Sequence, residues 1–152
     1  MSVSALDLPV RADGLELESA FDALVKEDVL SGNPVIVVTP SASGKSIVSL
    51  VTEGNTLVLK KIVRAWMPVA SNAVLGVKDD EAFQIFSELD ISILAMNGDK
   101  DLMGRDVTKK LVEVAGAKGV EMEGSHPCYL DSPTYFVDTI ISFINGLKTD
   151  LA

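Results

Sequence analysis

Apolar runs rich in β-branched residues recur along this 152-residue chain, and turn-forming residues bound each of them. Runs that are apolar without strict alternation are typical of strands buried on both faces of a sheet. The segments between them carry an apolar residue at every third or fourth position, which predicts amphipathic helices. Strand and helix therefore alternate. We predict an α/β fold with a mostly parallel sheet flanked by helices on both faces, formed as a single domain over residues 1–152.

The alternation assigns a residue range to each element. The predicted strands are Val35–Thr39, Ile62–Val69, Ile91–Met96 and Gly119–Met122, with a shorter candidate at Val3–Leu6. The predicted helices are Leu15–Val29, Ser46–Thr52, Asp79–Leu89, Arg105–Ala115 and Pro133–Leu147. Ligands of such sheets bind at the carboxyl ends of the strands. We therefore expect functional residues in the loops that follow residues 39, 96 and 123.

Charge and composition exclude several classes of function. With 13 basic and 22 acidic residues the net charge is −9, the wrong sign for binding a phosphate backbone or an anionic membrane surface. A single cysteine, Cys128, and a single histidine, His126, provide neither an internal disulfide nor a multi-histidine metal site. No run approaches the roughly 18 apolar residues of a membrane span. We expect a cytoplasmic protein without metal or cofactor, and with no nucleic-acid or membrane partner.

Three residues of catalytic type follow predicted strands in the order Ser43, Asp101, His126. A serine hydroxyl is a weak nucleophile near neutral pH, so it needs a base such as imidazole and a carboxylate that holds the imidazole in the right tautomer. The order nucleophile, acid, base is the one that α/β-hydrolases use. We predict these three roles in that order, with the amide of Gly44 as an oxyanion-hole donor. Each residue alone is more often an ordinary loop residue, so the prediction depends on their joint occurrence.

Several segments resemble a family of small α/β-hydrolases, the alpha/beta-hydrolase domain-containing protein 14 family. These segments are Ser41–Gly44, Asn97–Gly104, Gly124–Asp131 and, at a strand end, Ala5–Pro9. The family's nucleophile lies in an S-x-S-G turn, its acid is the second aspartate of G-D-x-D-x-M-G, and its base is the histidine of G-x-H-P-C-Y-L-D. These positions map onto Ser43, Asp101 and His126. The resemblance covers nearly the whole chain and implies acyl transfer on small esters or amides, including deacylation, to water or another acceptor.

The chain also departs from this family at its start. Family members carry further residues before the D-L-P strand, including a central strand and an H-G loop that gives the second oxyanion amide. The chain therefore resembles an N-terminally truncated hydrolase that lacks its first strands. The missing strand would leave the edge of Val35–Thr39 open. We expect Val3–Leu6 to pair with this edge, or a second copy of the chain to self-associate there.

The same loops supply further candidate site residues. Ser71 and Met103 are candidates to line a small acyl pocket, with loop packing as the alternative. The resemblance selects Asp101 over Asp99 as the acid, which leaves Asp99 as a turn-stabilising carboxylate. We expect Cys128 to be a packed thiol rather than a nucleophile.

Two other function classes stay open at this point. Gly44-Lys45-Ser46 matches the end of a phosphate-binding loop, which would make the protein a nucleotide binder. The first glycine of that motif falls on Thr39, whose β-branched side chain poorly suits the position, and a nucleotide site leaves the His126 loop unexplained. The other class is a hydrolase-like protein without activity, whose exposed sheet edge recruits a partner strand.

Overall fold

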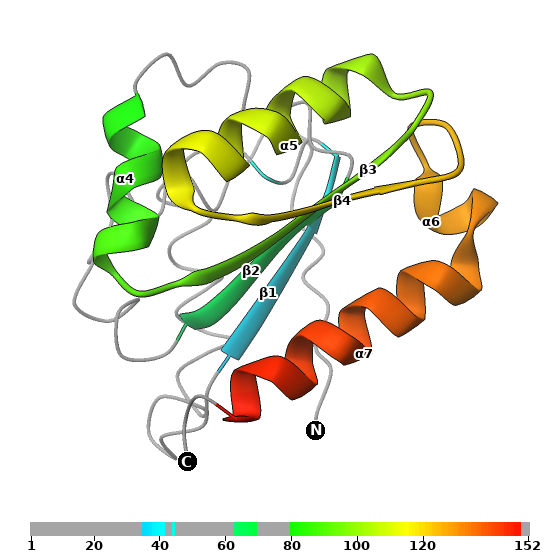
Figure 1. The fold of residues 1–152 in the computed structure, drawn as a ribbon. Helices are drawn as coiled ribbons and strands as arrows, with labels where there is room; N and C mark the ends of the chain where they lie inside the picture. Colours follow the sequence, from blue (N-terminus) through cyan, green and yellow to red (C-terminus); the bar gives the residue numbers. More distant parts are fainter. Residues whose placement is uncertain (1–34, 42–43, 45–62, 70–79, 150–152) are drawn as a thin grey trace, which may run out of the picture.

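The computed structural model describes residues 35–41, 44, 63–69 and 80–149, which form a sheet with helices on both faces (Figure 1). Its four strands are β1 (Val35–Pro40), β2 (Val63–Val69), β3 (Ser92–Gly98) and β4 (Lys118–Met122), in the order β1-β2-β3-β4. Every neighbouring pair is parallel. The carboxyl ends of all four strands therefore lie at one edge of the sheet. The predicted α/β fold with a parallel sheet is confirmed.

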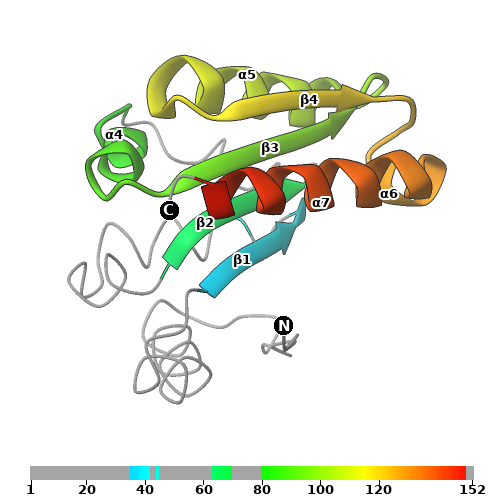
Figure 2. The same cartoon turned by 60° about the horizontal axis from the view of Figure 1, so that its bottom comes forward.

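Three of the four described helices, α4, α5 and α7, lie where the apolar periodicity predicts them. They are α4 (Asp80–Glu88), α5 (Leu102–Ala115), α6 (Cys128–Asp131) and α7 (Pro133–Thr149). Figure 2 shows the short α6, which we did not predict, beyond the arrowheads of β3 and β4. Helix α5 begins three residues before the predicted Arg105. In the part of the chain that the structure describes, no helix combines the length and the apolar character of a membrane span.

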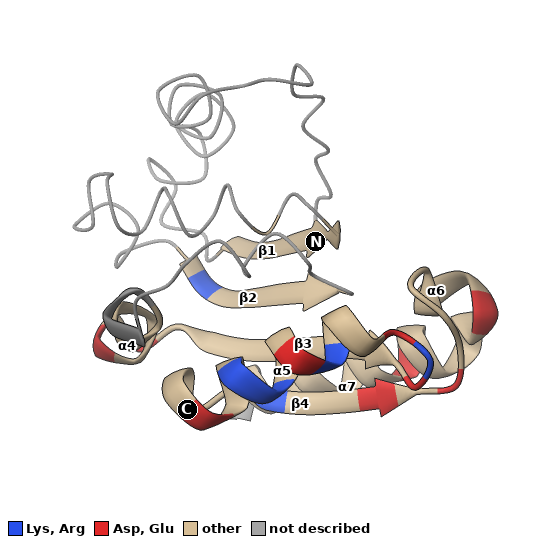
Figure 3. Ribbon diagram, turned by 90° about the horizontal axis from the view of Figure 1, so that it is seen from above, with Lys and Arg blue, Asp and Glu red and all other residues tan. Residues whose placement is uncertain are grey.

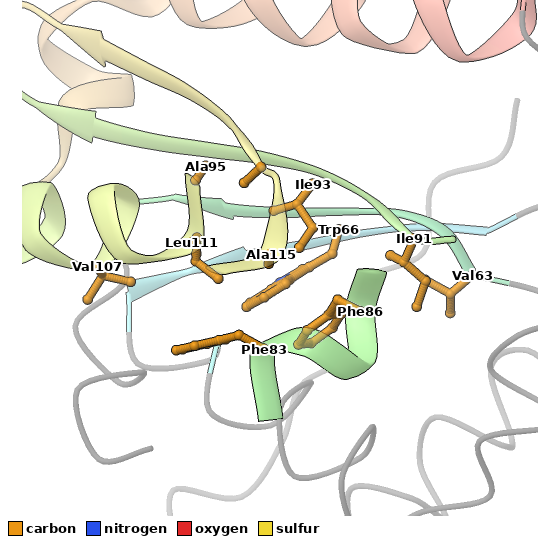
Figure 4. Packing of buried hydrophobic residues seen from close by; sticks show 11 residues of the cluster. Val63, Trp66, Phe83, Phe86, Ile91, Ile93, Ala95, Val107, Leu111 and Ala115 are labelled. Carbon is orange, nitrogen blue, oxygen red and sulfur yellow. The ribbon is translucent and has the colours of Figure 1, made fainter. Parts of the chain in front are cut away.

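The first core cluster lies between the sheet and helices α4 and α5. Trp66 of β2 is fully buried and stacks on Phe86 of α4, with their ring centroids 4.8 Å apart. Its indole N–H donates a hydrogen bond of 2.8 Å to the hydroxyl of Thr39 on β1. Figure 4 shows Trp66 and Phe86 among the other residues of the cluster. The cluster comprises Val63, Trp66, Phe83, Phe86, Ile91, Ile93, Ala95, Val107, Leu111, Ala115 and Ala117.

The second core cluster covers the opposite face of the sheet. Its buried members are Met67, Val69, Leu94, Met96, Met122 and Cys128, and α7 contributes the partly buried Phe136, Ile140, Phe143 and Ile144. Side chains of β3 alternate between the clusters, since Ile93 and Ala95 lie in the first and Leu94 and Met96 in the second. This alternation is why the strand reads as one continuous apolar run in the sequence.

Strand β1 forms one edge of the described sheet. Among the described residues its strand pairing is with β2 alone, and the side chain of Val38 is 49% exposed. The predicted strand Val3–Leu6 and the predicted helices Leu15–Val29 and Ser46–Thr52 lie outside the described residues. Pairing at the β1 edge, by Val3–Leu6 or by a second copy of the chain, therefore stays a prediction.

The buried bond between Trp66 and Thr39 should contribute measurably to stability. Thr39→Val leaves the indole N–H unpaired, and we expect the free energy of unfolding to fall by about 1–3 kcal/mol. Trp66→Phe leaves the hydroxyl unpaired instead. The double variant leaves neither group unpaired, so its loss should be smaller than the sum of the two single losses. Urea unfolding followed by circular dichroism measures the stability of all three variants. A loss in the double variant equal to the sum of the two single losses would contradict this account.

Candidate active site

Ser41 is the first residue beyond β1, at the carboxyl edge of the sheet. Its backbone has a positive φ of 48°, which is uncommon for a residue with a Cβ atom and costs about 1–3 kcal/mol. Its hydroxyl oxygen lies 2.9 Å from Nε2 of His126. Strain of this kind occurs where the surrounding structure holds a side chain in a required position.

His126 lies in the loop between β4 and α6, and its second ring nitrogen meets a carboxylate. Nδ1 lies 2.9 Å from Oδ2 of Asp101. A carboxylate only accepts hydrogen bonds, so in the neutral ring Nδ1 carries the proton and Nε2 accepts from the hydroxyl of Ser41. The three side chains thus form one hydrogen-bonded row across three loops. The His126 side chain is 39% exposed and that of Asp101 is 4% exposed, so solvent reaches the ring but hardly reaches the carboxylate.

Asp101 also begins α5. Its Oδ1 accepts a hydrogen bond of 3.1 Å from the amide of Gly104, which makes it the N-cap of the helix. A Cβ atom at Gly104 would collide with the Asp101 carboxylate. The glycine therefore lets the carboxylate lie close to the helix while its other oxygen contacts His126.

Asp99 holds the loop before Asp101 against the loop that carries His126. Its Oδ1 accepts a 2.9 Å hydrogen bond from the amide of Gly124. Its backbone carbonyl accepts one from the guanidinium of Arg105, whose Nε also lies 2.7 Å from Glu121 Oε2. Figure 3 shows acidic and basic residues near the start of α5 and the end of β4. The two aspartates thus differ in their contacts: Asp101 meets the imidazole, and Asp99 joins the two loops.

Cys128 begins α6 and is fully buried in the second core cluster. Burial raises the pKa of its thiol, and the nearby Asp101 carboxylate raises it further. The thiol therefore stays protonated near neutral pH, as a packed side chain and not as a nucleophile.

The structure brings together two of the three predicted catalytic residues, Asp101 and His126. Ser43 and Ser71 lie outside the described residues, so their predicted roles stay predictions. Gly44 is buried, and Met103 is 52% exposed in the first turn of α5. Sequence reasoning missed Ser41 as the serine beside the ring. The available signal was its place directly after an apolar run that ends at a proline.

The described ranges contain no group of three or more His, Cys, Asp or Glu side chains that could hold a metal ion. Lys45 and Ser46, on which a phosphate-binding loop would depend, lie outside the described residues.

Fold and sequence comparisons relate this chain to the α/β-hydrolases, at low sequence identity. Among curated proteins it is 28% identical to ABHD14B of Homo sapiens over 123 residues, which is 80% of this chain and 54% of that protein. It is 25% identical to ABHD14B of Pongo abelii over 122 residues, with the same coverage. The name of both relatives gives protein-lysine deacylation as a proposed activity. The chain spans about half the length of these relatives.

A solved structure shows the same fold. The crystal structure of a predicted CIB-like hydrolase from Thermoplasma acidophilum superposes with a TM-score of 0.68 at 17% identity, covering 90% of this chain and 62% of that one. At this identity the likeness concerns the fold alone. No protein-family model matches the chain.

The close approach of the two loops requires a glycine at position 98. A Cβ atom there would collide with the backbone carbonyls of Gly124 and Ser125, so Gly98→Ala must push the His126 loop away. We expect the free energy of unfolding to fall by about 1–3 kcal/mol, as for other overpacked sites. Gly146→Ala on α7 is the control, because nothing lies within 4 Å of its added Cβ and alanine favours a helix. Urea unfolding compares the two, and equal stability of the two variants would refute the prediction.

Proposed function

We propose that this chain carries the acyl-transfer site of a serine hydrolase, with Ser41 as nucleophile, His126 as general base and Asp101 as the acid that orients the base. One observation carries the proposal: Ser41 Oγ lies 2.9 Å from His126 Nε2, while His126 Nδ1 lies 2.9 Å from Asp101 Oδ2. The first distance suits proton transfer from the Ser41 hydroxyl to the ring, and the second suits a hydrogen bond that orients the ring. The positive φ of Ser41 supports the same role, because α/β-hydrolases present their nucleophile on a strained turn after a strand.

The reaction follows from the direction of these hydrogen bonds. As Ser41 Oγ attacks the carbonyl carbon of the acyl group, its proton passes to Nε2 of His126. The ring becomes positively charged, and the ionised Asp101 stabilises that charge through Nδ1–H. The imidazolium then gives its proton to the leaving alcohol or amine as the acyl–oxygen or acyl–nitrogen bond breaks. Water, or another acceptor, attacks the resulting ester of Ser41 with the same ring acting as base, and this restores the hydroxyl.

Ser41 takes the role that the sequence assigned to Ser43. Both nitrogens of His126 are already within hydrogen-bond distance of Ser41 and Asp101, which favours the earlier serine. In α/β-hydrolases one oxyanion donor is the amide after the nucleophile. With Ser41 as nucleophile that amide belongs to Ala42 instead of Gly44.

The proposed substrates are small acyl esters or amides. Attack on an acyl carbonyl suits the nucleophile and base, and the proposed deacylase activity named for ABHD14B supports an acyl-lysine amide as one such substrate. Met103 is a candidate to contact the acyl group, because its side chain is exposed two residues from Asp101. Ser71 remains the second candidate for this pocket.

A fluorophosphonate probe tests the nucleophile, because it reacts with an activated serine and not with an ordinary hydroxyl. We expect the wild-type protein to be labelled, Ser41→Ala to lose labelling, and Ser43→Ala to keep it. Mass spectrometry of the labelled peptide identifies the modified position. Loss of labelling in Ser43→Ala alone would return the role to Ser43. A wild-type protein that is not labelled would instead favour the inactive, partner-binding alternative.

Matched amide substitutions test the acid. Asp101→Asn can still cap α5 through its carbonyl oxygen. Its NH2 group, which only donates hydrogen bonds, then faces Nδ1 of His126 and favours the tautomer protonated at Nε2. We expect the rate of labelling, or of p-nitrophenyl acetate hydrolysis, to fall by orders of magnitude, as wrong-tautomer variants do. Asp99→Asn keeps an acceptor for the Gly124 amide, so the rate in this variant should fall much less. Equal losses in the two variants would contradict the assignment of Asp101.

A further inference from the structure

Side chains from elsewhere hold the three consecutive residues before His126. The carbonyl of Glu123 accepts a 2.7 Å hydrogen bond from the hydroxyl of Ser132. The amide of Gly124 donates to Asp99, as described above. Ser125 donates twice to Oδ2 of Asp131, from its amide over 2.7 Å and from its hydroxyl over 2.8 Å. None of these hydrogen bonds takes part in the proposed reaction. The last two hold Ser125, which directly precedes the proposed general base His126.

Asp131 is the last residue of α6 and packs directly against Gly124. Gly124 has a φ of 143°, and a Cβ atom on it would lie 2.7 Å from both Cβ and Oδ2 of Asp131. The absence of a side chain at Gly124 therefore gives the carboxylate its place beside Ser125. The hydroxyl and amide of Ser125 hold the pKa of Asp131 below its ordinary value, and the charge of Lys100 adds to this. Near neutral pH the group is therefore an ionised acceptor.

The ring of His126 is partly exposed, at 39%, and belongs to neither core cluster of the described residues. Its hydrogen-bond partners among those residues, Ser41 and Asp101, lie on loops that follow other strands. The direction of the ring therefore depends on the backbone at residues 125 and 126. A displacement of about 1 Å at a reacting group can lower a rate on the order of 100-fold.

We propose that Asp131 is a positioning residue for the proposed reaction: by holding Ser125, its carboxylate sets the backbone from which His126 reaches both Ser41 and Asp101. Only the effect of Asp131 on a reaction rate rests on the proposed function. Its effect on the geometry of the ring can be measured without a substrate.

The single histidine of the chain makes that measurement direct. In untagged protein, the ring nitrogens of His126 give the only histidine side-chain signals in a two-bond ¹H–¹⁵N spectrum. When the ring is neutral, we expect the wild-type protein to show the tautomer protonated at Nδ1. Asp131→Ala should show a mixture that contains the tautomer protonated at Nε2, because the hydrogen bond from Nδ1–H to the Asp101 carboxylate becomes weaker. Asp131→Asn keeps one acceptor without the charge and should give a smaller change.

Controls and kinetics separate this role from a merely structural one. Asp138→Ala changes an exposed carboxylate on α7 and should leave the spectrum unchanged. Circular dichroism verifies folding, and if Asp131→Ala does not fold, Asp131→Asn decides. Fluorophosphonate labelling of Asp131→Ala should slow by about 10- to 100-fold.

A wild-type tautomer in the folded Asp131 variants would overturn the proposal. A changed tautomer in a protein whose wild type is never labelled would uphold the positioning role and refute the proposed hydrolase function.

Discussion

The site depends on the two hydrogen bonds that the buried carboxylate of Asp101 makes. A charge that is 4% exposed is stable only when its oxygens are hydrogen-bonded, and each oxygen here has a different partner. One accepts from the Gly104 amide at the start of α5, and the other meets the ring of His126. The position of the helix and the position of the imidazole are therefore coupled. A change that shifts the first turn of α5 also shifts the ring, although the two belong to different loops of the sheet.

The parallel sheet brings the remaining parts to this carboxylate. All four strands end at one edge, so the sheet itself brings the residues after β1, β3 and β4 near one another. Close backbone contact then joins the loops, because Gly98 lies against the carbonyls of Gly124 and Ser125. Asp99 and Asp131 add hydrogen bonds from either side. The His126 loop is thus held by backbone packing and by two carboxylates that do not contact the ring.

The four described strands and the His126 loop could be predicted from the sequence because apolar, β-branched runs and the loops that follow them leave a local signal. The choice of Asp101 over Asp99 came from the family resemblance. The choice of serine left a weaker signal, because Ser41 and Ser43 are only two residues apart in the sequence. Two features favour Ser41: its place directly after β1, which ends at Pro40, and its positive φ, which the sequence does not show. The start of α5 was missed because Leu102 and Met103 are exposed and the buried position of the first turn is a glycine, Gly104, which gives no apolar signal. The bond between Asp131 and Ser125 depends on a loop conformation that spacing cannot reveal.

The large sequence separation inside the site has a consequence for folding. Ser41 and His126 are 85 positions apart, and each pair of parallel strands between them is joined by a long crossover connection. Contacts of this range close a long loop and are slow to form compared with local helical contacts. The hydrogen bond between the two side chains therefore exists only once the sheet is assembled from β1 to β4. Under the proposed function, a newly made or partly unfolded chain has no activated serine, so the proposed chemistry reports the native population and not the amount of polypeptide.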